Sequence, residues 1–197
     1  MPTKRKHAQV SEKHIWLDFQ APVTLVVFLL ALLAFLLSGE GEAPFYRDWF
    51  SLTKTSFADP AQYVRLFSFV LGSSGAAFIS DWLMFLLLAP QVEEQMGPGK
   101  FIVLLAATAG VTGLLGILSG VTGWMGNGCF MLMLIILTVV FSLQGGKIPL
   151  ISGLVFSLYL WQEVTYFQAS SQIISQLIPI GGAIVGVILG LLLHRKR

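Results

Sequence analysis

Two carboxylic acids are the residues of this sequence best suited to acid–base chemistry inside an apolar environment. Asp81 interrupts the apolar stretch 66–92, and Glu163 lies near the end of a second stretch that begins at Ile148. Ionisable side chains within apolar membrane segments are rare and are functional candidates. Two such groups that faced each other could act as general acid and general base. The alternatives are that Asp81 is solvated or protonated near a helix end, and that Glu163 marks the boundary with water.

Nucleophilic catalysis by serine needs a neighbouring base that removes the hydroxyl proton. The sequence has three histidines, all near its ends: His7, His14 and His194. Ser119, Ser171 and Ser175 have no histidine close to them in the sequence, and we interpret them as ordinary helix or loop residues. The spacing of the remaining residues predicts no metal site, no phosphate-binding loop and no nucleic-acid-binding stripe, so we expect no cofactor and no nucleic acid.

A glycine-rich segment at 116–128 is a candidate binding site. It contains five glycines in thirteen residues, which favour an irregular backbone. It has no charged residue, so its side chains do not require contact with water. Irregular backbone at membrane depth is tolerated only where protein or a water-filled cavity surrounds it. Trp124, Met125 and Asn127 lie in this segment and, with Asp81, are the candidate binding residues. For Asn127, a hydrogen bond to the local backbone is the structural alternative, and Trp124 with Met125 could instead fill the cavity.

The elements that position these residues are predicted to be transmembrane helices. The 197 residues are 55% apolar and 11% charged, whereas a soluble domain carries roughly 25% charged residues. Uncharged runs at 19–39, 101–146 and 164–193 are long enough for one, two and one crossings. They do not alternate as barrel strands do. The expected helices are 21–38, 63–92, 101–118, 125–143, 148–166 and 174–193.

The predicted organisation is an all-α, polytopic membrane protein with a basic tail at 1–18 and one six-helix domain at 19–194. The connection 39–62 mixes aromatic and acidic residues, which suits the headgroup layer of the lipid bilayer. Basic residues concentrate on the cytoplasmic side of membrane proteins. Both termini are therefore predicted to be cytoplasmic, in an inner or plasma membrane. This orientation places nine basic residues inside and three outside, the latter being Arg47, Lys54 and Arg65.

Glycines recur every four residues in the last predicted helix, at Gly182, Gly186 and Gly190. Residues at this spacing lie on one face of a helix. Small residues there let a neighbouring helix approach closely in a membrane. We interpret the three glycines as a helix-packing face.

These features together resemble the rhomboid family of intramembrane serine proteases. Arg65-Leu66-Phe67-Ser68 is similar to the start of rhomboid helix 2, and the turn 90–97, with Glu93 and Gly97, is similar to the turn that follows that helix. Lys147-Ile148-Pro149 resembles the start of helix 5. The glycine-rich segment and the glycine face occur in the same order, so the resemblance covers about 22–193.

The catalytic residues that the resemblance implies are absent. The family's Gly-x-Ser-Gly motif reads Gly123-Trp124-Met125-Gly126, which places Met125 at the serine position. The catalytic histidine lies three residues before the first glycine of the packing face, which is Pro179 here. A thioether has no proton to lose and proline has no side-chain base. The oxyanion-hole pattern of His, three residues and Asn reads Ala77 to Asp81, and a carboxylate there would repel an oxyanion.

The resemblance therefore implies a rhomboid-like protein without rhomboid catalysis, a pseudoprotease. Such a protein would admit transmembrane segments of client membrane proteins between helices 2 and 5 and bind them without cutting. Two alternatives stay open. The first is an active intramembrane protease, serine-type as in the family or using other groups such as Asp81 and Glu163. The second is a small transporter or channel, although no inverted repeat is evident.

Overall fold

The computed structural model describes residues 21–37, 48–52, 60–73, 75–120, 123–146, 150–169 and 173–195. The elements are α1 (Pro22–Leu37), α3 (Pro60–Ser68), the 3₁₀ turn η1 (Phe69–Leu71), α4 (Gly75–Met96), α5 (Pro98–Leu118), α6 (Gly128–Gln144), α7 (Leu150–Ala169) and α8 (Ile173–Arg195). Apart from one isolated bridge, all regular structure in the described ranges is helical, which confirms the all-α class there. The predicted tail 1–18, with His7 and His14, and Ser171 lie outside the described residues.

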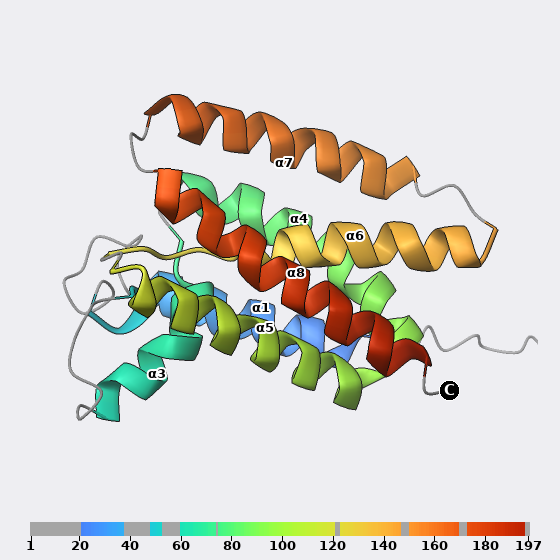
Figure 1. Ribbon diagram of the computed structural model, residues 1–197, viewed down its shortest axis with the longest axis horizontal. Helices are drawn as coiled ribbons and strands as arrows, with labels where there is room; N and C mark the ends of the chain where they lie inside the picture. The colour runs from blue at the N-terminus through green and yellow to red at the C-terminus, as the bar shows by residue number, and fades with distance from the viewer. Residues whose placement is uncertain are drawn as a thin grey trace, which may run out of the picture.

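The helices form a bundle in which α6 is the most enclosed element (Figure 1). α8 crosses the bundle in contact with both α5 and α6, while α4 lies against α6 and α1 against α4. Buried side chains point from α6 in several directions, among them Phe130, Met133 and Ile135. A helix that is apolar on all sides is expected at the centre of a bundle. α7 lies at the edge, along the side of α4 and α6 (Figure 1).

The glycine face of α8 lies against α5 and α6. A Cβ added to Gly182 would lie 1.8 Å from Thr112 Oγ1 on α5, and one added to Gly186 would lie 2.5 Å from Thr108 Oγ1. At Gly190 the nearest atom would be Leu137 Cδ1 on α6, at 2.8 Å. At Gly182 a methyl group would also lie 2.8 Å from Thr112 Cβ, so the helices would have to separate, whereas at Gly186 and Gly190 neighbouring side chains would have to shift. This close approach sets the separation of α8 from its neighbours.

Two of the expected helix boundaries are wrong. The helix expected at 63–92 is interrupted, because α3 and η1 end at Leu71 and α4 begins only at Gly75. Gly72 is extended, and a Cβ there would lie 2.5 Å from the Phe50 carbonyl oxygen, so the close approach of the two backbones requires glycine at this break. The helix expected from 125 begins at Gly128, because Gly126 has φ 137°, which a helix does not accommodate.

A buried glutamate holds the first helix in place. Glu93, near the end of α4, is fully buried, and its carboxylate accepts hydrogen bonds from the backbone N–H groups of Val23 and Thr24, both at 2.8 Å. The hydroxyl of Thr24 donates a third bond, of 2.7 Å. The first N–H groups of a helix have no partner within the helix, and the helix dipole attracts an anion there. Glu93 thus satisfies the start of α1 from a distant part of the chain.

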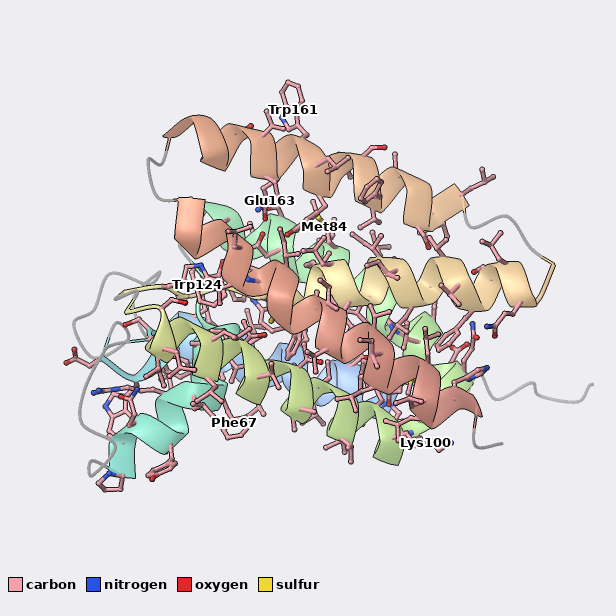
Figure 2. All side chains as sticks on the ribbon, viewed as in Figure 1. Phe67, Met84, Lys100, Trp124, Trp161 and Glu163 are labelled. Atoms are coloured by element: carbon pink, nitrogen blue, oxygen red, sulfur yellow. The ribbon has the colours of Figure 1, made fainter. Side chains whose placement is uncertain are left out.

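A basic side chain serves the opposite end of another helix. Lys100, in the first turn of α5, donates a hydrogen bond of 2.7 Å to the carbonyl oxygen of Leu193 in the last turn of α8. Cations at helix C-termini interact favourably with the unpaired carbonyls and the helix dipole. Figure 2 shows Lys100 beside this end of α8.

We predict that Lys100→Met lowers the free energy of unfolding by about 1 kcal/mol, because the carbonyl loses its charged donor. The measurement is SDS-induced unfolding in mixed micelles. Lys100→Arg is the matched control and should recover most of the loss. Equal losses in both variants would show that the charge at this position contributes nothing.

Within the described residues, two helical stretches are long and apolar enough to cross a membrane by length and composition, namely Pro98–Leu118 and Leu177–His194. Two shorter apolar helices, α1 and α6, accompany them.

Candidate functional site

The carboxylate of Asp81 joins three separate segments of the chain. Asp81 lies in the second turn of α4, and its two oxygens accept different hydrogen bonds. Gln162 Nε2 on α7 donates to Oδ1 at 2.6 Å, and Ser73 Oγ in the break before α4 donates to Oδ2 at 3.0 Å. The side-chain amide of Asn127, immediately before α6, approaches the backbone oxygen of Asp81 at 3.5 Å. Asp81 is therefore a junction between α4, α7 and the loop preceding α4.

Glu163 lies beside this junction. It follows Gln162 on α7, and Figure 2 shows its side chain pointing from α7 into the bundle, whereas Trp161 points away from it. The residue directly before Glu163, Gln162, is bonded to Asp81, so the backbone of α7 brings Glu163 next to this junction. Tyr159, one helical turn before Glu163, is buried and supplies a hydroxyl beside the Glu163 carboxyl. The two acidic residues singled out in the sequence thus come from different helices to the same place.

The first turn of α6 forms the floor of this site. A Cβ added to Gly128 would lie 3.6 Å from the Tyr159 hydroxyl and 3.7 Å from Cβ of Pro179 on α8. Pro179 is buried inside α8, next to the start of α6. The position that the rhomboid resemblance assigns to the histidine is thus near the start of α6, and it holds a proline ring.

Trp124 and Met125 lie on another side of the glycine-rich segment. The Trp124 ring packs on Phe69, with centroids 5.3 Å apart. Its backbone forms a bridge with Leu52, through a hydrogen bond of 2.8 Å from Leu52 N to Trp124 O. A Cβ added to Gly72 would lie 3.0 Å from Met125 Cβ. Both side chains therefore contact the segments around η1, and neither has a described contact with Asp81 or Glu163.

The glycine-rich segment itself is held by backbone hydrogen bonds. Gly123 N donates to Leu52 O at 2.7 Å, and Gly126 N donates to Phe69 O at 3.1 Å. Gly123 and Gly126 have φ angles of 77° and 137°, which residues other than glycine rarely adopt. These backbone N–H groups form hydrogen bonds with the neighbouring loop, as buried backbone polar groups outside regular structure must.

The described serine and histidine side chains do not resemble a catalytic pair. Ser119 Oγ donates to Leu115 O at 2.7 Å, within its own helix. His194 lies in the last turn of α8, packed on Phe141 with centroids 4.4 Å apart, and its Nδ1 is buried without a partner. Ser175 belongs to α8, but its side chain lies outside the described residues. In the described ranges no three His, Cys, Asp or Glu side chains are grouped to hold a metal ion.

Sequence reasoning singled out Asp81 and Glu163 but missed Gln162, Ser73 and Tyr159. A signal for Gln162 was present, since it is a second polar residue directly before Glu163 in an apolar helix. Nothing in the sequence indicates that Ser73 and Gln162 bind the same carboxylate. The arrangement is suited to holding a charge in place, because each oxygen of Asp81 already accepts one hydrogen bond. Two of about four acceptor positions on that carboxylate remain for another donor.

No family model matches this chain, and no curated protein matches it.

Proposed function

We propose that this protein is a multi-pass membrane protein with a rhomboid-like arrangement of helices and no serine-protease activity, which binds transmembrane segments of client proteins. Both termini lie on the cytoplasmic side. The clients pack where α4 and α7 meet, beside the bond between Asp81 and Gln162.

Membrane residence is supported by the large apolar side chains on the outside of the bundle. They are exposed on every described helix, for example Leu33 on α1, Leu118 on α5 and Leu192 on α8. Several polar residues are buried among the apolar core, including Glu93, Thr108 and Thr112 at zero exposure. A water-soluble protein rarely exposes contiguous apolar surface of this extent, whereas lipid favours it. α3 repeats the pattern on a small scale, because Tyr63, Val64 and Phe67 are exposed while Gln62 is buried.

The observation that carries the client-binding proposal is the attachment of α7. Among the side chains of α7 that the structure describes, the buried ones form a narrow stripe of Ser152, Val155 and Tyr159. Its exposed apolar residues cover most of the remaining circumference: Leu150, Ile151, Leu154, Phe156, Leu158, Leu160, Trp161 and Val164. On α4, the residue Leu87 is 43% exposed, two turns after Asp81, and Leu158 on α7 is 47% exposed, one turn before Gln162. A transmembrane helix needs such apolar neighbours for close packing in lipid.

The absence of serine catalysis is supported by the residues at the two expected positions. Met125 contacts the backbone around Gly72, and Pro179 lies near Gly128. Neither residue type can act as nucleophile or base. The carboxylate alternative has a weaker basis, because both oxygens of Asp81 already accept hydrogen bonds from Ser73 and Gln162.

The test is site-specific photocrosslinking in liposomes to a synthetic 21-residue leucine–alanine span that carries one lysine. A benzoylphenylalanine replaces Leu87 or Leu158, or replaces Val103 on the exposed surface of α5 as the matched control. We expect crosslinking at Leu87 and Leu158 at least about tenfold above Val103. Equal yields at all three positions would contradict a client site at α4 and α7.

Cleavage of the span is measured in the same samples together with fluorophosphonate labelling. We expect neither product nor label. Cleavage with a labelled serine would overturn the assignment of Met125 and Pro179. Cleavage without label that disappears in Asp81→Asn would support the carboxylate alternative.

A further inference from the structure

We infer that the client spans bound at α4 and α7 carry a basic residue, lysine or arginine, whose cationic group binds between Asp81 and Glu163. This inference rests on the proposed client-binding function and names the chemistry that the site selects.

The site has two carboxyl groups and no matching cation among the described residues. Asp81 is bonded to neutral donors, Gln162 and Ser73, and the neighbour of Glu163 is the neutral Tyr159. Arg65 donates to the backbone oxygen of Asp48 at 2.6 Å, below the bundle on α3. Lys100 binds Leu193 O at the opposite end of α8 from this site (Figure 2).

Each element around the two acids presents neutral groups to them. α4 contributes Met84, which Figure 2 shows on the side toward α7, and α6 contributes Gly128 and the preceding Asn127. α8 contributes the ring of Pro179. In a medium of low dielectric constant, two neighbouring carboxylates without a cation are costly, and intramembrane acids are normally paired with a base. An ammonium or guanidinium group placed between the two carboxylates would attract both of them and offset the repulsion between them.

The apolar surroundings identify the source of that cation as a membrane helix. Leu87 follows Asp81 on α4 and Leu158 precedes Gln162 on α7, so in these antiparallel helices both leucines lie on the same side of the Asp81–Gln162 bond, and both are exposed. At about 1.5 Å per residue, Asp81 lies about 9 Å along α4 from Gly75, within the helix rather than at its first turn. A basic residue at the same depth of a neighbouring span would reach the acids while the rest of the span packs on leucines. A free ion in water would gain nothing from those leucines.

A second, independent observation is that a hydrogen-bonding group on the buried face of α7 has no partner. Ser152 is fully buried on the same stripe as Val155 and Tyr159, and its hydroxyl has no hydrogen-bond partner. An unpaired buried hydroxyl costs free energy in the resting position of α7. α7 is held to α4 chiefly by the bond from Gln162 to Asp81, so a small shift of α7 can admit a client helix beside that bond. A lysine or arginine of the client then donates to the acceptor positions of Asp81 that Gln162 and Ser73 leave open.

The experiment uses four synthetic spans of identical leucine–alanine composition in liposomes. The first has lysine at the depth of Asp81, the second has lysine near the other end, the third has glutamate at the first position and the fourth has no charge. Crosslinking is read from benzoylphenylalanine at Leu158. We expect the first span to exceed each of the other three by about tenfold, and Asp81→Asn with Glu163→Gln to abolish this preference. Glu94→Gln, an exposed acid at the far end of α4, should leave it unchanged.

The charge-swapped variant Glu163→Lys separates electrostatic recognition from a change in folding. We expect it to lose the preference for lysine and to bind the glutamate span best. Protection of Cys129, the one cysteine of the chain and fully buried, against a thiol-reactive dye verifies that each variant is folded. Equal crosslinking of all four spans at Leu158, still above the Val103 control, would overturn the inference and leave client binding intact. Crosslinking of every span at or below that control would remove the proposed function as well.

Discussion

Glu93→Gln is expected to lower the free energy of unfolding by about 3 kcal/mol, because it removes an anion that three donors share. Glutamine has one oxygen and one NH₂ group in its side-chain amide. Its NH₂ group would therefore face the N–H of Val23 or of Thr24, which is also a donor. The substitution therefore loses charge-assisted bonds and adds a donor–donor contact at a fully buried position. The loss of the negative charge at the start of α1 adds to the effect.

The measurement is SDS-induced unfolding of the purified protein in mixed micelles, followed by the reaction of Cys129 with a thiol-reactive dye. The neighbouring Glu94 is exposed, so Glu94→Gln is the matched control and should change the unfolding free energy by less than about 0.5 kcal/mol. Thr24→Val is expected to lose about 1 kcal/mol, since it removes the hydroxyl bond alone. If Glu93→Gln and Glu94→Gln gave the same small loss, the three bonds to α1 would carry no net stability.

Gly182→Ala is expected to destabilise the bundle by about 3 kcal/mol, because the added methyl group overlaps α5. The new Cβ would lie 1.8 Å from Thr112 Oγ1 and 2.8 Å from Thr112 Cβ, so rotation of the threonine side chain cannot relieve the whole overlap. α8 must move away from α5, and the contacts at Gly186 and Gly190 weaken with it. Elsewhere in a helix the same substitution is favourable, because alanine has the higher helix propensity.

Gly153→Ala supplies the matched control for this prediction. Gly153 lies in α7 with nothing within 4 Å of an added Cβ, so alanine there should raise the unfolding free energy by about 1 kcal/mol. A double-mutant cycle with Thr112→Ala isolates the contact, and removal of Oγ1 should recover part of the loss at Gly182. Losses that add independently in the double variant would contradict direct contact between these two residues.

Local features of the sequence were sufficient for the helical class and for the approximate positions of the apolar helices. α1, α5 and α8 coincide closely with uncharged runs. The prediction failed where a contact between distant segments decides the backbone. Gly72 lies at the break in the second expected helix, where an added Cβ would meet the Phe50 carbonyl oxygen, and Gly126 delays the start of α6 through a positive φ. Glycines mark both places in the sequence, at Gly72 and Gly75 and within 116–128, but the residue at which each helix resumes is set by the tertiary contacts.

Composition and periodicity by themselves determined that this chain is helical and strongly apolar, that its acids are few, and that Asp81 and Glu163 are unusual. These properties depend on residues adjacent in the chain, whose effects on propensity and burial are local. The tertiary structure decided which groups those acids meet. Asp81 is bonded to Gln162, 81 positions away, and Glu93 to the start of α1, 69 and 70 positions away. Partners at such separations are fixed by how whole helices pack, and each helix alone is compatible with many neighbours.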